Sequence, residues 1–217
     1  MLVSFHRESI FHIVTSLRRH EIDFFLKKAI EVLEMEVAMQ NRPLIYMSRC
    51  FGFDKCRYDG KDFPCGFAEK LKKHAEIIHW CPETAIDLGC PREKIRVVRI
   101  NGKNLLFQPE TGKFFTEKMN EYSDNYLKTL ENIDGFFLKA KSPSCGVKNT
   151  KLFEGKSEKI ISYEASGFFA DRVLSLFPDT PVITELDLEN KEKTKDFLTK
   201  VFLKYGRIPA CFSEFFS

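Results

Sequence analysis

The chain has 217 residues, the length of one ordinary domain, and a core of that size buries about 70% of the unfolded surface without a disulfide or a metal. With 43% hydrophobic residues, 30% charged residues and 22 phenylalanines, the composition excludes a disordered protein. The net charge of +3 is too small to indicate nucleic-acid binding by itself, and no run of about 20 apolar residues predicts a membrane span.

The first 41 residues are predicted to form a helical extension ahead of the main domain. Apolar residues recur near the 3.6-residue helical period over residues 22–39. Pro43 ends this pattern, because proline disfavours helix in the residue before it. We therefore expect an extension over residues 1–41 and a main domain over residues 42–217. The N-terminus lacks the features of a signal peptide, so a cytoplasmic protein is expected.

After the extension, strands alternate with helices. Strands are predicted over residues 44–47, 76–80, 95–100, 105–107, 135–140 and 182–186. Helices are predicted over residues 67–74, 113–132, 167–177 and 191–205. Asn101-Gly102 indicates a hairpin, since both residues tolerate positive φ. The expected fold class is α/β, a parallel sheet flanked by helices on both faces, with the N-terminal helical extension.

The cysteines indicate a metal or a reactive site. Seven is an odd number, and without a secretion signal the thiols are expected to be reduced. Cys50, Cys81 and Cys145 each come just after a predicted strand. Because the carboxyl ends of parallel strands meet at one edge of a sheet, where ligands bind, we expect these three thiols to converge.

Three converging thiolates leave several interpretations open. Structural zinc usually takes ligand pairs at C-x₂₋₄-C spacing, and the chain has no C-x-x-C pair. Iron–sulfur clusters are held by cysteine thiolates, commonly four, so three ligands would leave one iron open as a Lewis acid. Cysteines that are buried only for packing remain the third interpretation.

Two motifs beside these cysteines carry further chemistry. Cys81-Pro82-Glu83 places a carboxylate near a thiol, where it can act on water or on a substrate, although capping of a helix is an alternative. The turn over residues 142–146 sets two hydroxyl groups beside Cys145, and an ordinary surface turn is the alternative. Several lysines near this turn either form a solvated face or hold a phosphate; they are Lys139, Lys141, Lys148 and Lys151.

Four short motifs, in this order and spacing, resemble the thiouracil desulfidase family, known as TudS-type desulfidases. The motifs are Ser48-Arg49-Cys50-Phe51-Gly52, Cys56-Arg57-Tyr58-Asp59-Gly60, Cys81-Pro82-Glu83 and Lys139-Ala140-Lys141-Ser142-Pro143-Ser144-Cys145-Gly146. The resemblance continues through Gly167-Phe168-Phe169-Ala170 to Glu185 and covers residues 43 to about 207. The extension over residues 1–41 falls outside the family pattern.

The resemblance implies a 4Fe–4S cluster held by Cys50, Cys81 and Cys145, with the fourth iron open to the sulfur of a thiolated pyrimidine. It also implies that Glu83 is the catalytic carboxylate and Ser142 a catalytic hydroxyl near the substrate.

Other residues near the motifs receive secondary roles. Lys141 and Ser144 are candidates for substrate contact. Residues 57–59 are expected to anchor the first loop. The remaining cysteines match no ligand position and are expected to be packing residues or free thiols; they are Cys56, Cys65, Cys90 and Cys211.

The leading hypothesis is an iron–sulfur-dependent desulfidase that removes sulfur from thiouracil, thiouridine or its nucleotide by non-redox hydrolysis. In this scheme Glu83 acts as general base towards water, and Ser142 orients the base or donates to an intermediate. The alternatives are a tRNA-binding module with a structural metal or cluster, and a zinc or redox-sensing protein. The expected partner is a small thiolated pyrimidine or nucleotide, with tRNA possible and no membrane, while the oligomeric state stays open.

Overall fold

The computed structural model describes residues 23–32, 42–205 and 215–216. The chain divides into two compact units, Met1–Arg42 and Pro43–Ser217. In the first unit residues 23–32 are helical, and the rest of the helix predicted over residues 22–39 lies outside the described residues. The domain boundary at residues 41–42 therefore stays a prediction. Within the described residues, no helix combines the length and the apolar character that a membrane span requires.

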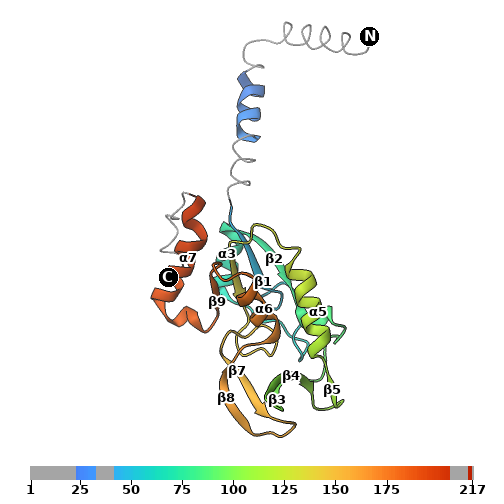
Figure 1. The fold of residues 1–217 in the computed structure, drawn as a ribbon. Helices are drawn as coiled ribbons and strands as arrows, with labels where there is room; N and C mark the ends of the chain where they lie inside the picture. Colours follow the sequence, from blue (N-terminus) through green and yellow to red (C-terminus); the bar gives the residue numbers. More distant parts are fainter. Residues whose placement is uncertain (1–22, 33–41, 206–214, 217) are drawn as a thin grey trace, which may run out of the picture. The chain divides into compact units, whose positions relative to one another are not determined.

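A four-stranded parallel sheet forms the centre of the second unit (Figure 1). Its strands are β1 (Leu44–Ser48), β2 (Glu76–Trp80), β6 (Gly135–Leu138) and β9 (Val182–Thr184). Their order is β2-β1-β6-β9, and every neighbouring pair is parallel. The chain moves outwards from β1 to β2 and then returns to add β6 on the other side of β1. This reversal creates a switch point between β1 and β6, where ligands of such sheets bind.

Helices cover both faces of this sheet, as the alternation of strands and helices predicts. One core cluster joins Ile45 and Met47 to helices α3 (Gly66–His74) and α7 (Lys191–Phe202). The side chains of neighbouring strand residues point to the opposite face. There Tyr46 and Phe136 pack with helices α5 (Thr116–Leu127) and α6 (Phe168–Leu176). The predicted α/β fold class is confirmed.

A second sheet, which the sequence interpretation did not foresee, adjoins this layer. Its strands are β3 (Arg96–Ile100), β4 (Lys103–Gln108), β5 (Lys113–Phe114), β7 (Thr150–Glu154) and β8 (Ile160–Ala165). Their order is β5-β4-β3-β7-β8, with β3 parallel to β7 and the other pairs antiparallel. The predicted hairpin between β3 and β4 is present, with φ of 49° at Asn101 and 75° at Gly102. Only β3 and β4 of this sheet were predicted.

Some predicted boundaries are wrong for local reasons. The helix predicted over residues 113–132 begins only at Thr116, because residues 113–114 pair with β4. Strand β9 ends at Thr184 because the Asp187 carboxylate accepts from the Thr184 amide and hydroxyl and starts the 3₁₀ turn η1 (Asp187–Glu189). A short helix, α4 (Pro82–Ala85), follows β2, and the turn η2 (Leu203–Tyr205) extends α7.

Candidate functional site

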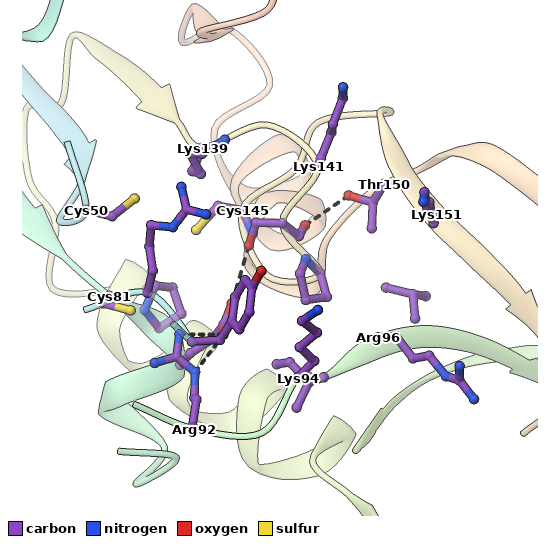
Figure 2. A pocket seen from close by; sticks show the side chains of 18 of the residues that line it. Cys50, Cys81, Arg92, Lys94, Arg96, Lys139, Lys141, Cys145, Thr150 and Lys151 are labelled. Atoms are coloured by element: carbon purple, nitrogen blue, oxygen red, sulfur yellow. Dashed lines mark hydrogen bonds and ion pairs between the residues drawn. The ribbon is translucent and has the colours of Figure 1, made fainter. Parts of the chain in front are cut away.

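The three predicted cysteines lie on loops that leave neighbouring parallel strands. Cys50 follows β1, Cys81 follows β2 and Cys145 follows β6. All three line one cavity of about 1170 Å³, and Figure 2 shows their sulfur atoms on the same side of it. Cys50 and Cys145 are buried, whereas Cys81 is half-buried. The convergence follows from the strand order, since β1 and β6 flank the switch point.

The loop that carries Cys145 is closed by its own hydrogen bonds. The Ser142 hydroxyl oxygen accepts from the amides of Ser144 at 3.1 Å and Cys145 at 3.0 Å. The Thr150 hydroxyl donates to the Ser142 carbonyl at 2.9 Å, the contact drawn as a dashed line in Figure 2. At Gly146 a Cβ would stand 2.1 Å from the Thr150 hydroxyl oxygen. This turn therefore requires glycine, and it holds Cys145 rigidly.

The N-terminal end of helix α6 hydrogen-bonds to the same loop. The first free amides of the helix donate to loop carbonyls, Phe168 to Pro143 at 3.0 Å and Ala170 to Ser144 at 3.0 Å. Gly167 lies so close that a Cβ would stand 2.4 Å from the Ser144 carbonyl carbon. Unpaired amides at a helix start need such acceptors. The Gly167 motif thus serves the cysteine loop directly.

A partly buried ion pair ties the ends of three strands together. Lys139 pairs with Glu185, which follows β9. The second Glu185 oxygen accepts from the Ala140 amide at 2.7 Å. The Lys139 amide donates to the Ser48 hydroxyl at the end of β1 at 2.9 Å. These contacts fix the part of the cavity lining formed by Ser48, Lys139 and Ala140.

Glu83 lies in the first turn of α4 with its carboxylate held on both sides. One oxygen accepts from Arg92, at 3.0 Å from Nε and 2.7 Å from Nη2. The other oxygen accepts from the Ser144 hydroxyl at 3.0 Å. Arg92 also donates to the carbonyls of Cys56 and Gly89 at 2.9 Å and 2.8 Å. Glu83 also lines the cavity, so these partners hold its carboxylate at the cavity surface.

The charge on Arg92 is stabilised by its partner. Burial opposes the charge, but the Glu83 carboxylate outweighs burial and raises the pKa of Arg92. Sequence reasoning missed Arg92, because it lies in an irregular loop without a motif. The only signal in the sequence was that Arg92 lies nine residues after Glu83, and this spacing alone does not predict a contact.

The predicted substrate residues separate into two groups. Lys141 and Ser142 line the cavity. The Ser142 hydroxyl lies 3.4 Å from Glu83 Oε1. Ser144 is fully buried and is not among the residues that line the cavity. Its hydroxyl donates to Glu83, and its contact with substrate stays a prediction.

Burial and neighbouring groups shift the pKa values of the three cysteine thiols in different directions. Burial, with Cys81 adding to it, raises the pKa of Cys50 to about 12. Burial also raises the pKa of Cys145 well above its ordinary value, again with Cys81 adding to it. A hydrogen bond from Cys56 lowers the pKa of Cys81 to about 6 against the effect of burial. Iron binding requires thiolates, so loading a cluster would release protons from Cys50 and Cys145.

Cys56, which the motifs left without a role, also lines the cavity. It is 3% exposed, and its side chain hydrogen-bonds to that of Cys81. Cys65 packs against the core, as expected, and Cys90 is exposed. Cys211 lies outside the described residues. The sequence held two signals for a fourth thiol at the site, the nearness of Cys56 to Cys50 and its place at the start of the second motif.

The rest of the cavity wall carries more cationic than acidic residues, since its acidic residues are Glu93, Glu110 and Glu158. Its cationic residues are Arg49, Arg57, Arg92, Lys94, Arg96, Lys139, Lys141 and Lys151.

Among the described residues, Lys94, Lys141 and Lys151 have no carboxylate partner; Lys94 lies 4.9 Å from the Tyr58 ring centroid and Lys151 6.0 Å from that of Tyr163. Trp80, at the end of β2, stacks on Tyr126 and is 40% exposed.

The residues of the first loop form their own contacts. Arg57 and Asp59 form an ion pair at 3.4 Å, and Asp59 accepts from the Lys61 amide at 3.2 Å. The Arg92 amide donates to the Tyr58 carbonyl at 2.9 Å. These contacts support the expected anchoring role of residues 57–59, although Arg57 and Tyr58 also line the cavity.

The donor set suits an iron–sulfur cluster. The three predicted ligands lie on three loops around one large cavity that Cys56 also lines, and soft ligands favour iron–sulfur clusters and zinc. No group of three or more histidine, cysteine, aspartate or glutamate side chains converges on a single metal ion in the described part of the chain. A cluster distributes its thiolates over different irons and needs no such convergence, so these cysteines fit it.

Comparison with known proteins gives the family. A sequence model described as 2-thiouracil desulfurase matches residues 45–185. The chain belongs to the 2-thiouracil desulfurase family. The match spans all four motifs from which the resemblance was predicted, and that prediction is confirmed.

One curated protein and one solved structure are similar to this chain. YbbK of Bacillus subtilis (strain 168), an uncharacterized protein, is 30% identical over 112 residues, which cover 48% of this chain and 73% of YbbK. The solved structure of a 4Fe–4S-dependent thiouracil desulfidase, TudS, is similar with a TM-score of 0.56 and 22% identity. That similarity covers 71% of this chain and 97% of the TudS chain, and it shows the shared fold.

Proposed function

We propose that this protein is a desulfidase that hydrolyses the C=S bond of thiolated pyrimidines, namely thiouracil, thiouridine or its nucleotide. One observation carries the proposal: Cys50, Cys81, Cys145 and Glu83 line a single cavity at the switch point of a chain that belongs to this family. The solved TudS structure supports the cofactor, because that relative is 4Fe–4S-dependent. The overall reaction adds water, forms the pyrimidine carbonyl and releases hydrosulfide.

Cys50, Cys81 and Cys145 would hold the 4Fe–4S cluster. When bound, such a cluster supplies a Lewis-acidic iron with an affinity for soft sulfur. The chain positions these three ligands through the closed turn at Ser142 and the strand ends joined by Lys139 and Glu185. Because an oxidising compartment would threaten both thiols and cluster, we place the protein in the cytoplasm.

Glu83 is the proposed general base. Its carboxylate accepts a proton from the water that attacks the thiocarbonyl carbon, and can later return that proton to the leaving sulfur. Arg92 and Ser144 position it, because each hydrogen-bonds a different carboxylate oxygen. Ser142, 3.4 Å from Glu83, donates to the carboxylate or to the developing oxyanion.

The substrate would enter along the cationic wall. Trp80 offers an exposed aromatic surface near Cys81 for a pyrimidine ring. Lys94, Lys141 and Lys151 offer positive charge to a phosphate group, although an unphosphorylated base needs none of them. The form of the substrate is therefore part of the test.

The test is turnover by full-length protein purified and assayed without oxygen. Substrates are 2-thiouracil, 4-thiouracil, the matching nucleosides and monophosphates, and thiolated tRNA. The proposal expects a brown protein that converts at least one small thiolated pyrimidine to its oxo form with equimolar hydrosulfide. Cluster-loaded protein that converts none of them, but binds tRNA with strong salt dependence, would instead favour an RNA-binding module.

A further inference from the structure

A fourth thiol stands beside one of the three cysteines proposed to hold the cluster. Cys56 and Cys81 line the same cavity, and their side chains hydrogen-bond to each other. Cys81 Sγ also lies 3.9 Å from the Cys56 carbonyl oxygen. Cys145 differs, because its thiol hydrogen-bonds the Ser48 hydroxyl. The side chains of the first pair are therefore immediate neighbours at the cavity.

Both cysteines are held at fixed positions by groups outside the pair. Arg92 reaches the Cys56 carbonyl at 2.9 Å and, with the same guanidinium, the Glu83 carboxylate at 2.7 Å. Glu83 is two residues from Cys81 on α4, so Arg92 links the two cysteine-bearing segments. The Thr84 hydroxyl further donates to the Cys81 carbonyl at 3.1 Å. Hydrogen bonds within the protein therefore hold the two cysteine-bearing segments next to each other.

We propose that Cys56 and Cys81 form a reversible disulfide when no cluster is bound, with hydrogen peroxide as the oxidant. Cys81 is half-buried at the cavity and Cys56 is 3% exposed, so peroxide reaches Cys81 first. The Cys81 sulfur attacks peroxide, which breaks the O–O bond and leaves a sulfenic acid and water. The Cys56 sulfur then attacks the sulfenic sulfur. The S–S bond forms, and water leaves with the hydroxyl group and the Cys56 proton.

This disulfide has two consequences for the proposed desulfidase. It removes Cys81 from the set of ligands, so cluster loading requires a thiol reductant. It also keeps Cys81 from irreversible oxidation to the sulfinic acid, because Cys56 consumes the sulfenic acid. Cys56 is then a resolving cysteine next to the site, which the four sequence motifs gave no role.

The first test maps disulfides in the full-length chain. Protein freed of cluster by a chelator, with circular dichroism to confirm that it is folded, is treated with hydrogen peroxide and then with an alkylating agent. Peptide mass mapping without reductant is expected to find Cys56 linked to Cys81, and dithiothreitol is expected to remove the link. The Cys65→Ser variant, which changes a cysteine packed against the core, is expected to form the same link.

The second test asks what Cys56 protects. After peroxide, wild-type protein is expected to regain cluster absorbance with iron, sulfide and dithiothreitol. Cys56→Ser protein is expected to stay unloaded and to carry sulfinic acid at Cys81. Separate alkylation of Cys56 and Cys81 after peroxide, or a link from Cys81 to Cys50 or Cys145, overturns the proposal. Neither test measures desulfidase turnover, so failure here is distinct from failure of the proposed function.

Discussion

Arg92 and Glu83 form an ion pair that is almost closed to solvent, with side chains 4% and 11% exposed and a shortest N–O distance of 2.7 Å. Arg92 Nε and Nη2 both donate to Glu83 Oε2. Glu83 Oε1 is therefore left to accept from the Ser144 hydroxyl. The pair therefore sets the direction of the proposed base. It also joins α4 to the loop that carries Cys56.

Arg92→Ala is expected to lower the free energy of unfolding by about 3–5 kcal/mol, because it leaves a buried carboxylate without its partner. Urea unfolding followed by circular dichroism measures the change. Lys118→Ala is the matched control, since it removes an exposed ion pair with Asp87 and is expected to cost at most about 1 kcal/mol. Equal effects of the two substitutions would contradict the structural role of Arg92.

Glu83→Gln is expected to retain the cluster and lose turnover by roughly 10²–10⁴-fold, because an amide cannot accept the proton from water. Turnover of the most active thiopyrimidine is compared at equal cluster content, measured by visible absorbance.

Glu110→Gln is the control for this experiment. Glu110 also lines the cavity but is exposed, so its substitution is expected to change turnover little. Near-normal turnover of Glu83→Gln would show that another group activates water. Loss of the cluster in Glu83→Gln would show that Glu83 belongs to the scaffold of the Cys81 loop.

Gly146→Ala is expected to destabilise the Cys145 loop by about 1–3 kcal/mol, the usual cost of overpacking, since the new methyl group overlaps the Thr150 hydroxyl. Thermal unfolding and cluster retention on dilution into air-free buffer report the change. Gly66→Ala, where a Cβ meets nothing within 4 Å, is expected to leave both unchanged. Full cluster retention in Gly146→Ala would mean that the turn is not needed to place Cys145.

Much of the fold is predictable from the sequence because the central strands are buried. Successive side chains of strand β1 pack on opposite faces of the sheet. The predicted bounds of β2 and α6 agree with the structure to within one residue. Strands β7 and β8 were missed, because Thr150–Glu154 mixes buried and charged residues and Ile160–Ala165 lies largely exposed at the edge of its sheet. Neither segment shows the continuous run of buried apolar residues that makes β1 recognisable.

The candidate site shows the same division. The positions of Cys50, Cys81 and Cys145 follow from strand ends, which sequence periodicity predicts. The contacts of Arg92 and Cys56 depend on the course of irregular loops, and nothing in their periodicity predicts them. The burial of Ser144 was not predictable for a related reason, since only the turn geometry decides which of the two serine hydroxyls lines the cavity.

The thiols are expected to differ in reactivity with pH in the cluster-free protein. Only the thiolate reacts with iodoacetamide. The lowered pKa of Cys81, about 6, predicts that its alkylation rate rises to a plateau near pH 7. The raised pKa of Cys50, about 12, predicts a rate that still climbs at pH 9. Mass mapping after timed alkylation measures both, and faster labelling of Cys50 than of Cys81 at pH 7 would contradict this order.

The central claim is that Cys50, Cys81 and Cys145 together hold the catalytic cluster. The most direct measurement is iron and sulfide content, visible absorbance and turnover for Cys50→Ala, Cys81→Ala and Cys145→Ala after anaerobic reconstitution, with Cys65→Ala as control. We predict that each of the three loses both the 4Fe–4S cluster and the activity, while Cys65→Ala keeps both. An active cluster in any one of the three variants, or full activity in iron-free wild-type protein, would contradict the claim.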